Sequence, residues 1–361
     1  MLEGTCPTYG ESSYRRTHFL VEESMFRVAL VGAGGMASVH ANCYAQIDGA
    51  ELVGIMDIQA SAAEKLAERH GAKAFTDFDL MLSELKPNVV DVCCPTPWHA
   101  EYVCRTAERA TELGVRGIST EKPMARTLEE CEKMTQACEK AGVPLFVAQV
   151  LRFFPEYAQA KKQVDAGAVG APAAIRTRRG GDMPHAWNDW YGKFEMSGGL
   201  TLDMIIHDFD WLRWTFGEVE RVYAKGSGAE HLPNLDYALV TLRFKSGSIA
   251  HVEGTWADPS GFKTCFEIAG DKGLLECSFN QPNPSPFTKS LTGANTARAG
   301  VAVPESPSGV NPYQAELAHF LSCLESGTVP CVTPKDGTEA VRIALAAIES
   351  MQTGKPVTLT R

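Results

Sequence analysis

A glycine-rich turn directly after a short apolar run constrains the fold of this chain more than any other feature. The run at 26–31 reads FRVALV, and a helix-compatible segment at 36–47 follows it, with Gly32-Ala33-Gly34-Gly35-Met36-Ala37 at the junction. Gly32 permits a tight turn, Gly34 lets the backbone approach a pyrophosphate, and Ala37 is small enough for close packing of the helix on the strand. Glycine-rich turns are common, and this motif is specific only because a predicted strand precedes the turn and a predicted helix follows it. Together they predict the first strand, turn and helix of a doubly wound parallel sheet.

The alternation of apolar runs and helical segments continues to about residue 150. Strands are predicted at 52–56, 89–94, 117–120 and 144–149, and helices at 60–70, 100–113 and 128–141. Strands that alternate with helices form a parallel sheet with helices packed against it. We therefore expect an α/β fold with a Rossmann dinucleotide-binding domain over 26–150.

Beyond residue 151 the apolar runs follow one another without helices between them. Strands are predicted at 237–244, 248–256, 263–269 and 273–279, a pattern typical of an antiparallel meander. Residues 281–312 are rich in Pro, Ser, Gly and Asn, which favours a long irregular loop, and helices are predicted at 312–326 and 334–353. The second domain, 151–361, should be an α+β domain with a large, open, mainly antiparallel sheet. We expect its last helix to pack back on the first domain.

Composition and charge exclude several classes of function. The chain has 34 Lys and Arg against 44 Asp and Glu, so its net charge of -10 offers no basic surface for nucleic acid or anionic lipid. No apolar stretch reaches the roughly 20 residues of a membrane-spanning helix. The 11 cysteines include no Cys-x-x-Cys pair, which favours reduced thiols in a cytoplasmic protein. Residues 1–25 are expected to be a poorly ordered leader.

An acidic residue at the end of the second strand indicates which dinucleotide binds. Asp57 lies 20 residues after Ala37, where a carboxylate can accept hydrogen bonds from an adenosine ribose. A carboxylate there repels a 2′-phosphate, and Ile58 and Gln59 follow without a basic residue before Lys65. NAD is therefore favoured over NADP. The alternative is that Asp57 only caps the following helix.

Two further passages carry candidate catalytic groups. Thr120-Glu121-Lys122-Pro123 ends a predicted parallel strand, the edge of the sheet at which ligands bind, although Lys122 could equally be an exposed surface lysine. If 202–216 is a helix, Asp203 and His207 lie one turn apart on one face, where carboxylate and imidazole can interact. A lone histidine on an apolar helix is usually a core residue, but an Asp four residues earlier and the paired glycines Gly198 and Gly199 favour a functional role.

The sequence contains no motif for metal binding, acyl transfer or nucleotide hydrolysis. Asp203 and His207 could supply two metal ligands, yet no His-Glu-x-x-His, His-Cys cluster or EF-hand loop is present, so we expect no metal. The chain also has neither a Gly-x-Ser-x-Gly elbow nor a phosphate-binding P-loop.

From residue 26 to 361 the chain resembles the glucose-fructose oxidoreductase and inositol dehydrogenase family, written Gfo/Idh/MocA. Four passages carry the likeness: VALVGAGGMA at 28–37, PTPWHAEYV at 95–103, TEKPMA at 120–125 and GGLTLDMIIHDFDWL at 198–212. LRFFPEY at 151–157 and the segment 334–350 resemble the entry into the second domain and the closing helix of the family. The segment 105–117 is longer than usual, which leaves the helix boundaries there open. The resemblance implies a Rossmann domain followed by a domain with an open sheet through which members frequently form oligomers, and we expect a homodimer or homotetramer.

The resemblance also assigns site residues, matched position by position. It implies that Lys122, Asp203 and His207 form the catalytic group, that Pro95, Thr96 and His99 line the nicotinamide side, and that Arg152 lies on the substrate side. The complete set of candidate cofactor-binding residues is Gly32, Gly34, Gly35, Met36, Ala37, Asp57, Ile58, Pro95, Thr96, His99, Glu121 and Lys122. The candidate substrate-binding residues are Lys122, Arg152, Trp187, Tyr191, Asp203 and His207. Trp187 and Tyr191 could stack on a sugar ring, or could be ordinary core aromatics.

The expected function is oxidation of a secondary hydroxyl of a sugar, cyclitol or related polyol by hydride transfer to NAD. His207 would act as the general base, Asp203 would orient its ring, and Lys122 would polarise the substrate oxygen. Two alternatives remain: a glycosidase that uses NAD for transient oxidation on the same scaffold, and a non-catalytic regulator that senses a sugar or nucleotide.

Overall fold

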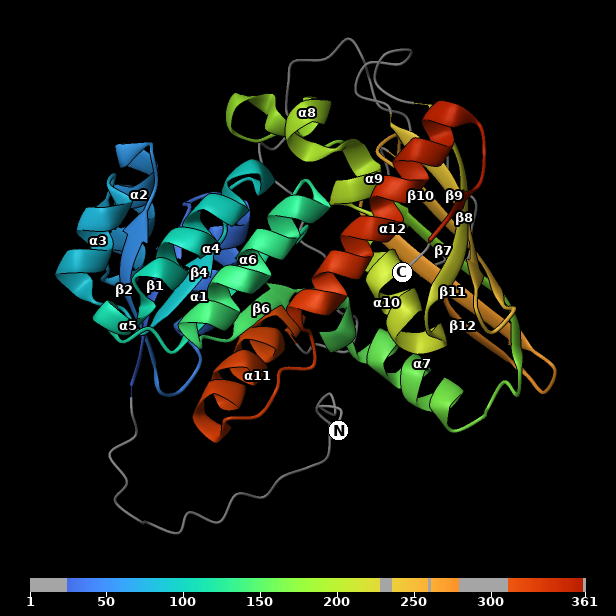
Figure 1. Cartoon of the computed structure of the whole chain (residues 1–361), viewed down its shortest axis with the longest axis horizontal. Coiled ribbons are helices and arrows are strands. Elements are labelled where there is room, and N and C mark those ends of the chain that lie inside the picture. Colours follow the sequence, from blue (N-terminus) through green and yellow to red (C-terminus); the bar gives the residue numbers. More distant parts are fainter. Residues whose placement is uncertain (1–24, 228–235, 259–260, 279–310, 360–361) are drawn as a thin grey trace.

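The computed structural model describes residues 25–227, 236–258, 261–278 and 311–359, and in this part of the chain two β-sheets lie side by side with helices around and between them (Figure 1). The expected leader, residues 1–25, lies outside the described residues except for Met25, and so does most of the expected loop at 281–312.

The first sheet has six parallel strands in the order β3-β2-β1-β4-β5-β6. Their bounds are β1 Phe26–Val31, β2 Ala50–Met56, β3 Lys73–Phe75, β4 Val89–Val92, β5 Gly117–Glu121 and β6 Leu145–Ala148. Strands β4, β5 and β6 are buried along their whole length, as expected where helices cover both faces of a parallel sheet. This sheet confirms the predicted Rossmann fold.

Helices connect these strands. They are α1 Gly35–Tyr44, α2 Ala60–His70, α3 Phe78–Leu85, α4 His99–Glu108, α5 Ala110–Leu113 and α6 Leu128–Ala141. The predicted helix at 100–113 is two helices, because the backbone at Arg109 leaves the helical conformation. β3 and α3 were not expected, since a three-residue strand and an eight-residue helix give little periodicity.

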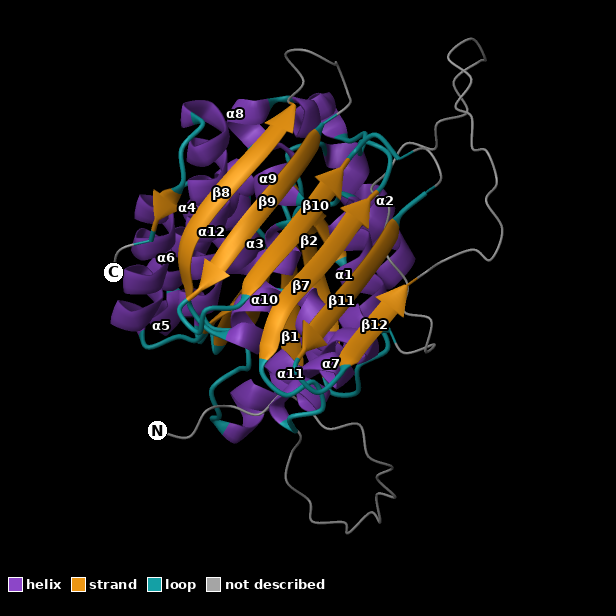
Figure 2. Cartoon of the chain, turned by 90° about the vertical axis from the view of Figure 1, so that its right-hand side faces the viewer, coloured by secondary structure: helices purple, strands orange, loops and turns teal. Residues whose placement is uncertain are grey.

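The second sheet has seven strands in the order β12-β11-β7-β10-β9-β8-β13. Their bounds are β7 Pro172–Gly180, β8 Val219–Ser227, β9 Tyr237–Phe244, β10 Ile249–Thr255, β11 Lys263–Gly270, β12 Leu274–Ser278 and β13 Val357–Thr358. Every pair is antiparallel except β7 with β10. One face of the sheet is open (Figure 2), and the alternating burial along β9 shows that only the other face carries core residues. The predicted large, open, mainly antiparallel sheet is confirmed, although β7, β8 and β13 were not foreseen. The predicted continuous meander is wrong at one point, because β7 lies between β10 and β11 and pairs with both.

Helices on the buried side of this sheet join the two halves of the molecule. The helical segments after β6 are η2 Val150–Phe153, α7 Pro155–Asp165, η3 Trp187–Gly192, α8 Phe194–Ser197, α9 Gly199–Asp203, α10 Ile206–Phe216, α11 Pro312–Ser326 and α12 Pro334–Thr353. α12 contacts α9, α10 and β8, and also α6 and β6 of the first half. α11 contacts α1. The carboxyl ends of β1, β4 and β5 therefore face residues supplied by the second half.

Candidate active site between the two sheets

The glycine-rich turn has the conformation that its sequence requires. Gly32 follows β1 with a φ of 107°, which favours glycine, and a Cβ atom there would lie 2.9 Å from the backbone of Cys93 and Cys94. Gly34 is the N-cap of α1 and no side chain caps this helix. A Cβ added at Gly34 would meet nothing within 4 Å, so the space beside the turn is open. Open space next to uncapped helix N–H groups suits a phosphate.

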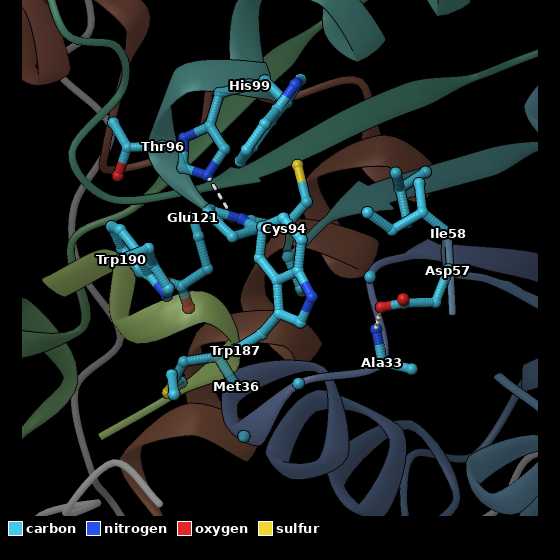
Figure 3. Close-up of a pocket in the computed structure, with 18 of the residues that line it drawn as sticks. Ala33, Met36, Asp57, Ile58, Cys94, Thr96, His99, Glu121, Trp187 and Trp190 are labelled. Atoms are coloured by element: carbon cyan, nitrogen blue, oxygen red, sulfur yellow. Dashed lines mark hydrogen bonds between the residues drawn. The ribbon is translucent and has the colours of Figure 1, made fainter. Parts of the chain in front are cut away.

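Asp57 is held against this turn from the end of β2. Its Oδ2 accepts a hydrogen bond of 2.8 Å from the Ala33 N–H (Figure 3), and its Oδ1 accepts one of 2.8 Å from the Gln59 N–H. The N-cap of α2 is Gln59, whose own side chain does not cap the helix. The position of the Asp57 carboxylate is thus fixed by both neighbouring loops, at the mouth of a cavity.

This cavity, of about 360 Å³, runs from the glycine-rich turn to Lys122 and Asp203. Of the 12 predicted cofactor-binding residues, 11 line it: Gly32, Gly34, Gly35, Met36, Asp57, Ile58, Pro95, Thr96, His99, Glu121 and Lys122. Ala37 does not, because it is fully buried between α1 and the sheet. The shape of the turn, the carboxylate beside it and the residues that line the cavity fit a dinucleotide.

The loops after β4 and β5 form the wall opposite the turn. The His99 ring lies between two backbone carbonyls, with Nδ1 2.9 Å from the Pro123 oxygen and Nε2 2.8 Å from the Cys94 oxygen. His99 therefore joins the two loops, and this contact holds the segment that carries Glu121 and Lys122 in place.

Lys122 meets the second half of the chain at Asp203. Its Nζ donates a hydrogen bond of 2.8 Å to the Asp203 carbonyl oxygen and lies 3.4 Å from the carboxylate Oδ1. The Lys122 side chain is only 16% exposed, so this is a largely buried contact and not a surface lysine. Burial raises the pKa of the Asp203 carboxyl, against the opposing effect of the Lys122 ammonium.

A second, smaller cavity continues beyond this contact. It shares Met36, Glu121, Lys122, Tyr191 and Asp203 with the first cavity and adds His207. Burial, followed by the positive charges of Lys122 and Arg179, holds the pKa of His207 well below its usual range. The imidazole is therefore neutral near pH 7 and able to accept a proton.

The expected contact between Asp203 and His207 is not formed. The helix predicted at 202–216 is broken into α9 and α10, with Met204 and Ile205 between them. Within the described residues the Asp203 carboxylate pairs with Lys122, and His207 Nδ1 has no hydrogen-bond partner. The i,i+4 spacing does not bring the two side chains together, because it holds only in a continuous helix.

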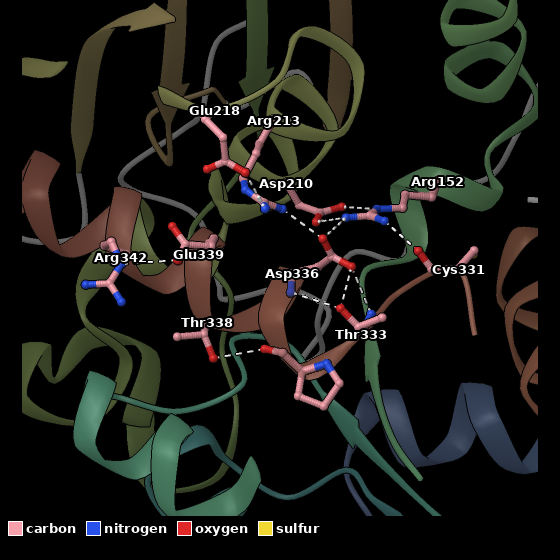
Figure 4. A network of polar contacts seen from close by, with 11 residues as sticks. Arg152, Asp210, Arg213, Glu218, Cys331, Thr333, Asp336, Thr338, Glu339 and Arg342 are labelled. Carbon is pink, nitrogen blue, oxygen red and sulfur yellow. Dashed lines mark hydrogen bonds and ion pairs between the residues drawn. The ribbon is translucent and has the colours of Figure 1, made fainter. Parts of the chain in front are cut away.

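Arg152 does not reach either cavity, contrary to expectation. Its guanidinium is 2% exposed and forms a bidentate pair with Asp210, with Nε and Nη2 at 2.7 and 2.6 Å from the two carboxylate oxygens (Figure 4). Nη1 donates to the Cys331 carbonyl oxygen at 2.6 Å, and Asp336 lies 3.3 Å away. Arg152 is thus part of a buried ion-pair network that joins η2, α10 and α12.

Trp187 and Tyr191, the aromatic residues expected near a sugar, differ in the cavities that they line. Tyr191 lines both, whereas Trp187 lines only the first cavity (Figure 3). Trp187 has 42% of its surface exposed, and its ring lies 6.1 Å from that of Trp98. Trp187 therefore lines the cavity that contains the glycine-rich turn and not the one that contains His207.

Several lining residues had no recognisable sequence signal. The second cavity also contains Arg179, Asp182, Met204, Trp256, Phe262 and Tyr313. Arg179 lies in β7, where three arginines in nine residues hide the alternating pattern of a strand. Tyr313 is the second residue of α11, and no local pattern relates it to a site whose other residues lie in earlier elements, between Met36 and Phe262.

A buried polar cluster lies beneath the cofactor cavity. His40 Nδ1 is 2.8 Å from Asp91 Oδ2 and 3.2 Å from Cys93 Sγ, and its Nε2 is 3.1 Å from Glu121 Oε1. The ligand atoms of His40, Asp91 and Cys93 lie close enough together to hold a metal ion. Because hydrogen bonds join His40 Nδ1 to Asp91 and Cys93, and His40 Nε2 lies beside the Glu121 carboxylate, we interpret the group as a network that supports Glu121. In the described part of the chain every cysteine is free, and no helix there has the length and apolar character to span a membrane.

Comparisons with known proteins agree with this architecture. Residues 26–149 match the model described as oxidoreductase family, NAD-binding Rossmann fold, and residues 157–276 match the GFO/IDH/MocA C-terminal domain. The chain is 29% identical over 341 residues to a myo-inositol 2-dehydrogenase of Thermotoga maritima, covering 92% of this chain and 98% of that protein. It is 28% identical over 348 residues to an NAD-dependent scyllo-inositol 2-dehydrogenase of Bacillus subtilis, covering 93% and 97%. A crystal structure of a probable dehydrogenase from Thermotoga maritima superposes with a TM-score of 0.77 at 28% identity, covering 92% and 98%.

Proposed function

Because this chain belongs to the Gfo/Idh/MocA family of oxidoreductases, we propose that it is an NAD-dependent dehydrogenase that oxidises a secondary hydroxyl of a sugar, cyclitol or related polyol. The observation that carries the proposal is the pair of cavities that meet at Lys122 and Asp203. One cavity has the glycine turn and the Asp57 carboxylate, and the other is lined by ionisable and aromatic side chains. The named relatives that act on inositols are consistent with a polyol.

NAD supplies the hydride acceptor when it is bound in the first cavity. The Gly32–Gly35 turn would hold the phosphates, and the Asp57 carboxylate would accept hydrogen bonds from the adenosine ribose. That carboxylate would repel a 2′-phosphate, which supports NAD over NADP.

The protein's own groups then prepare the hydroxyl for oxidation. His207 is the general base: its neutral imidazole takes the hydroxyl proton, because an alkoxide gives up hydride far more readily than an alcohol. The Lys122 ammonium donates to the same substrate oxygen and stabilises the negative charge that develops there. Asp203 fixes the position of that ammonium.

The test is a panel of polyols, including myo-inositol and scyllo-inositol, incubated with NAD while absorbance is followed at the NADH band. Net formation of NADH with at least one polyol is the expected result. Glycoside hydrolysis without net NADH would support the NAD-using glycosidase instead. Binding of polyol and NAD with neither reaction would support a sensing regulator.

A further inference from the structure

The smaller cavity, which contains His207, is the proposed substrate cavity, and Arg179 is its second cation besides Lys122. Arg179 lies on the inner face of β7, is 1% exposed, and lines the cavity together with Lys122, Asp203 and His207. Its charge is near enough to the His207 ring to contribute to the lowered pKa of that histidine. The guanidinium therefore lies close to the proposed base.

The hydrogen bonds of Arg179 are incomplete. Its Nε donates to Asp208 Oδ2 at 2.6 Å, and both side chains of this pair are buried. Its terminal nitrogen Nη2 is buried without a hydrogen-bond partner among the described residues, and the same holds for Asp208 Oδ1. A buried donor without an acceptor is costly, and it is uncommon in a folded protein.

A purely structural arginine in this molecule has a different set of contacts. Arg152 is equally buried, yet its Nε and both terminal nitrogens donate to the Asp210 carboxylate and the Cys331 carbonyl. Arg178, next to Arg179 in β7, points to the other face and contacts Glu253 and Asp258. Among these three arginines, only Arg179 combines a place in a cavity with a buried nitrogen that lacks a partner.

We propose that Arg179 binds the substrate, donating a hydrogen bond from its terminal nitrogen to a hydroxyl oxygen of a neutral polyol. A guanidinium has only donors, so it requires an acceptor such as a hydroxyl or carbonyl oxygen. The lining side chains include the cations Lys122 and Arg179 and the carboxylates Glu121, Asp182 and Asp203. Because the lining offers both donors and acceptors, it suits a ligand with several hydroxyl groups. Because carboxylates outnumber cations in the lining, it disfavours the negative charge of a sugar acid. This inference rests on the proposed function, since it concerns the substrate of the same site.

The experiment compares Arg179→Gln with Arg178→Gln, its neighbour on the opposite face of the strand. The substrate is the polyol of the panel that gives the highest rate of NADH formation. We expect Arg179→Gln to raise the KM for this polyol by about 10- to 100-fold, the effect of losing one hydrogen bond to a charged group, with the KM for NAD unchanged. Arg178→Gln should leave both constants unchanged. A folded Arg179→Gln enzyme with an unaltered polyol KM would overturn the proposal.

A pH profile separates this role from simple support of the fold. The charged and titratable groups around His207 come from several elements. They are Lys122 and Glu121 at the end of β5, Arg179 from β7, Asp182 just after β7, Tyr191 from η3, Asp203 from α9, Tyr313 from α11 and Asp208 on its own helix. Loss of the Arg179 charge should move the acid limb of kcat/KM to higher pH, because protonation of His207 becomes easier. An acid limb that stays in place would contradict the location of Arg179 beside the base.

Two further measurements keep the outcome unambiguous. Arg179→Gln leaves Asp208 buried without its partner, so if that variant does not fold, Arg179→Gln/Asp208→Asn removes both charges and is measured in its place. A neutral hexose is compared with its uronate, and preference for the uronate would overturn the proposal.

If no polyol yields NADH, the proposed function fails. Calorimetric titration of the NAD-bound protein with myo-inositol then tests whether Arg179 binds a polyol. Binding weakened in the variant supports the proposal, and absent or equal binding overturns it.

Discussion

At the scale of single residues, the surroundings of each ionisable group decide what it can do. His207 and Asp203 are both buried, but burial lowers the pKa of the imidazole and raises that of the carboxyl. Burial disfavours the charged form in both cases, so the signs are opposite. Lys122 and Arg179 add to the effect on His207, which leaves it neutral where an ordinary histidine would already be partly protonated.

This lowered pKa predicts the pH dependence of alcohol oxidation. A neutral base works above its pKa, so kcat/KM should be level near neutral pH and fall only when the pH drops well below 6.5, the usual pKa of histidine. Stopped-flow or steady-state rates between pH 4.5 and 8.5, a range of about four units around that value, measure this limb. In His207→Gln the limb should be lost and kcat should fall by roughly 100- to 10,000-fold. An acid limb that persists in this variant would assign the base to another group.

At the scale of secondary structure elements, the turn between β1 and α1 combines two glycines with different tasks. Gly32 needs its positive φ and its lack of a Cβ, since Cys93 and Cys94 lie directly against it. Gly34 has an ordinary φ of -78° and open space beside it. The fold requires the first glycine, and we propose that the second leaves room for the ligand to approach.

Alanine at each position should separate these two tasks. Gly32→Ala should lower the free energy of unfolding by roughly 1–3 kcal/mol, because a non-glycine residue must adopt a strained φ and push against backbone atoms. Gly34→Ala should change that free energy by less than about 0.5 kcal/mol but weaken NAD binding, because its methyl group enters the space next to the helix N–H groups. Urea unfolding and calorimetric titration with NAD measure the two effects. Equal stability of the two variants would show that the turn tolerates a Cβ at both positions.

At the scale of the whole molecule, a buried ion-pair network fixes the helices behind the substrate cavity. Arg152 in η2 binds Asp210 of α10, and Asp336 at the start of α12 lies within reach of both Arg152 and Arg213. Although burial acts against it, the Arg152 charge and the Thr333 contacts lower the pKa of Asp336 to about 2. The network connects η2, α10 and α12, three segments that are far apart along the chain (Figure 4).

Removal of one partner from this network should be far more damaging than removal of an exposed pair. Arg152→Met leaves Asp210 buried without a counter-charge, so the free energy of unfolding should fall by about 3–5 kcal/mol. Arg152→Met/Asp210→Leu should recover part of this loss, because no buried charge is left unpaired at Asp210. As a control, Lys73→Met breaks the exposed pair with Glu84 and should cost less than about 1 kcal/mol. A similar loss in Arg152→Met and Lys73→Met, measured by urea unfolding, would contradict a stabilising role for the network.

The sequence alone was enough to predict the features that depend on neighbouring residues. The glycine turn, the parallel strands around it and the hairpins β9-β10 and β11-β12 depend on local spacing, so the Rossmann sheet, the mainly antiparallel second sheet and most of the lining of the first cavity could be predicted. A carboxylate 20 residues beyond the turn could be placed as well, because one strand, one helix and one further strand have predictable lengths. The insertion of β7 between β10 and β11 could not be predicted from local spacing.

Only the tertiary structure decided how the second half completes the site. The helix breaks after Asp203, whose carboxylate contacts Lys122 and forms no hydrogen bond with His207 Nδ1, and the arginine at the second cavity is Arg179 and not Arg152. Both outcomes depend on contacts between residues tens of positions apart. Local periodicity carries no information about such contacts, because it reflects the conformation of one segment. The packing of separate elements determines which buried charge forms an ion pair within the protein and which keeps a free hydrogen-bonding group for a ligand.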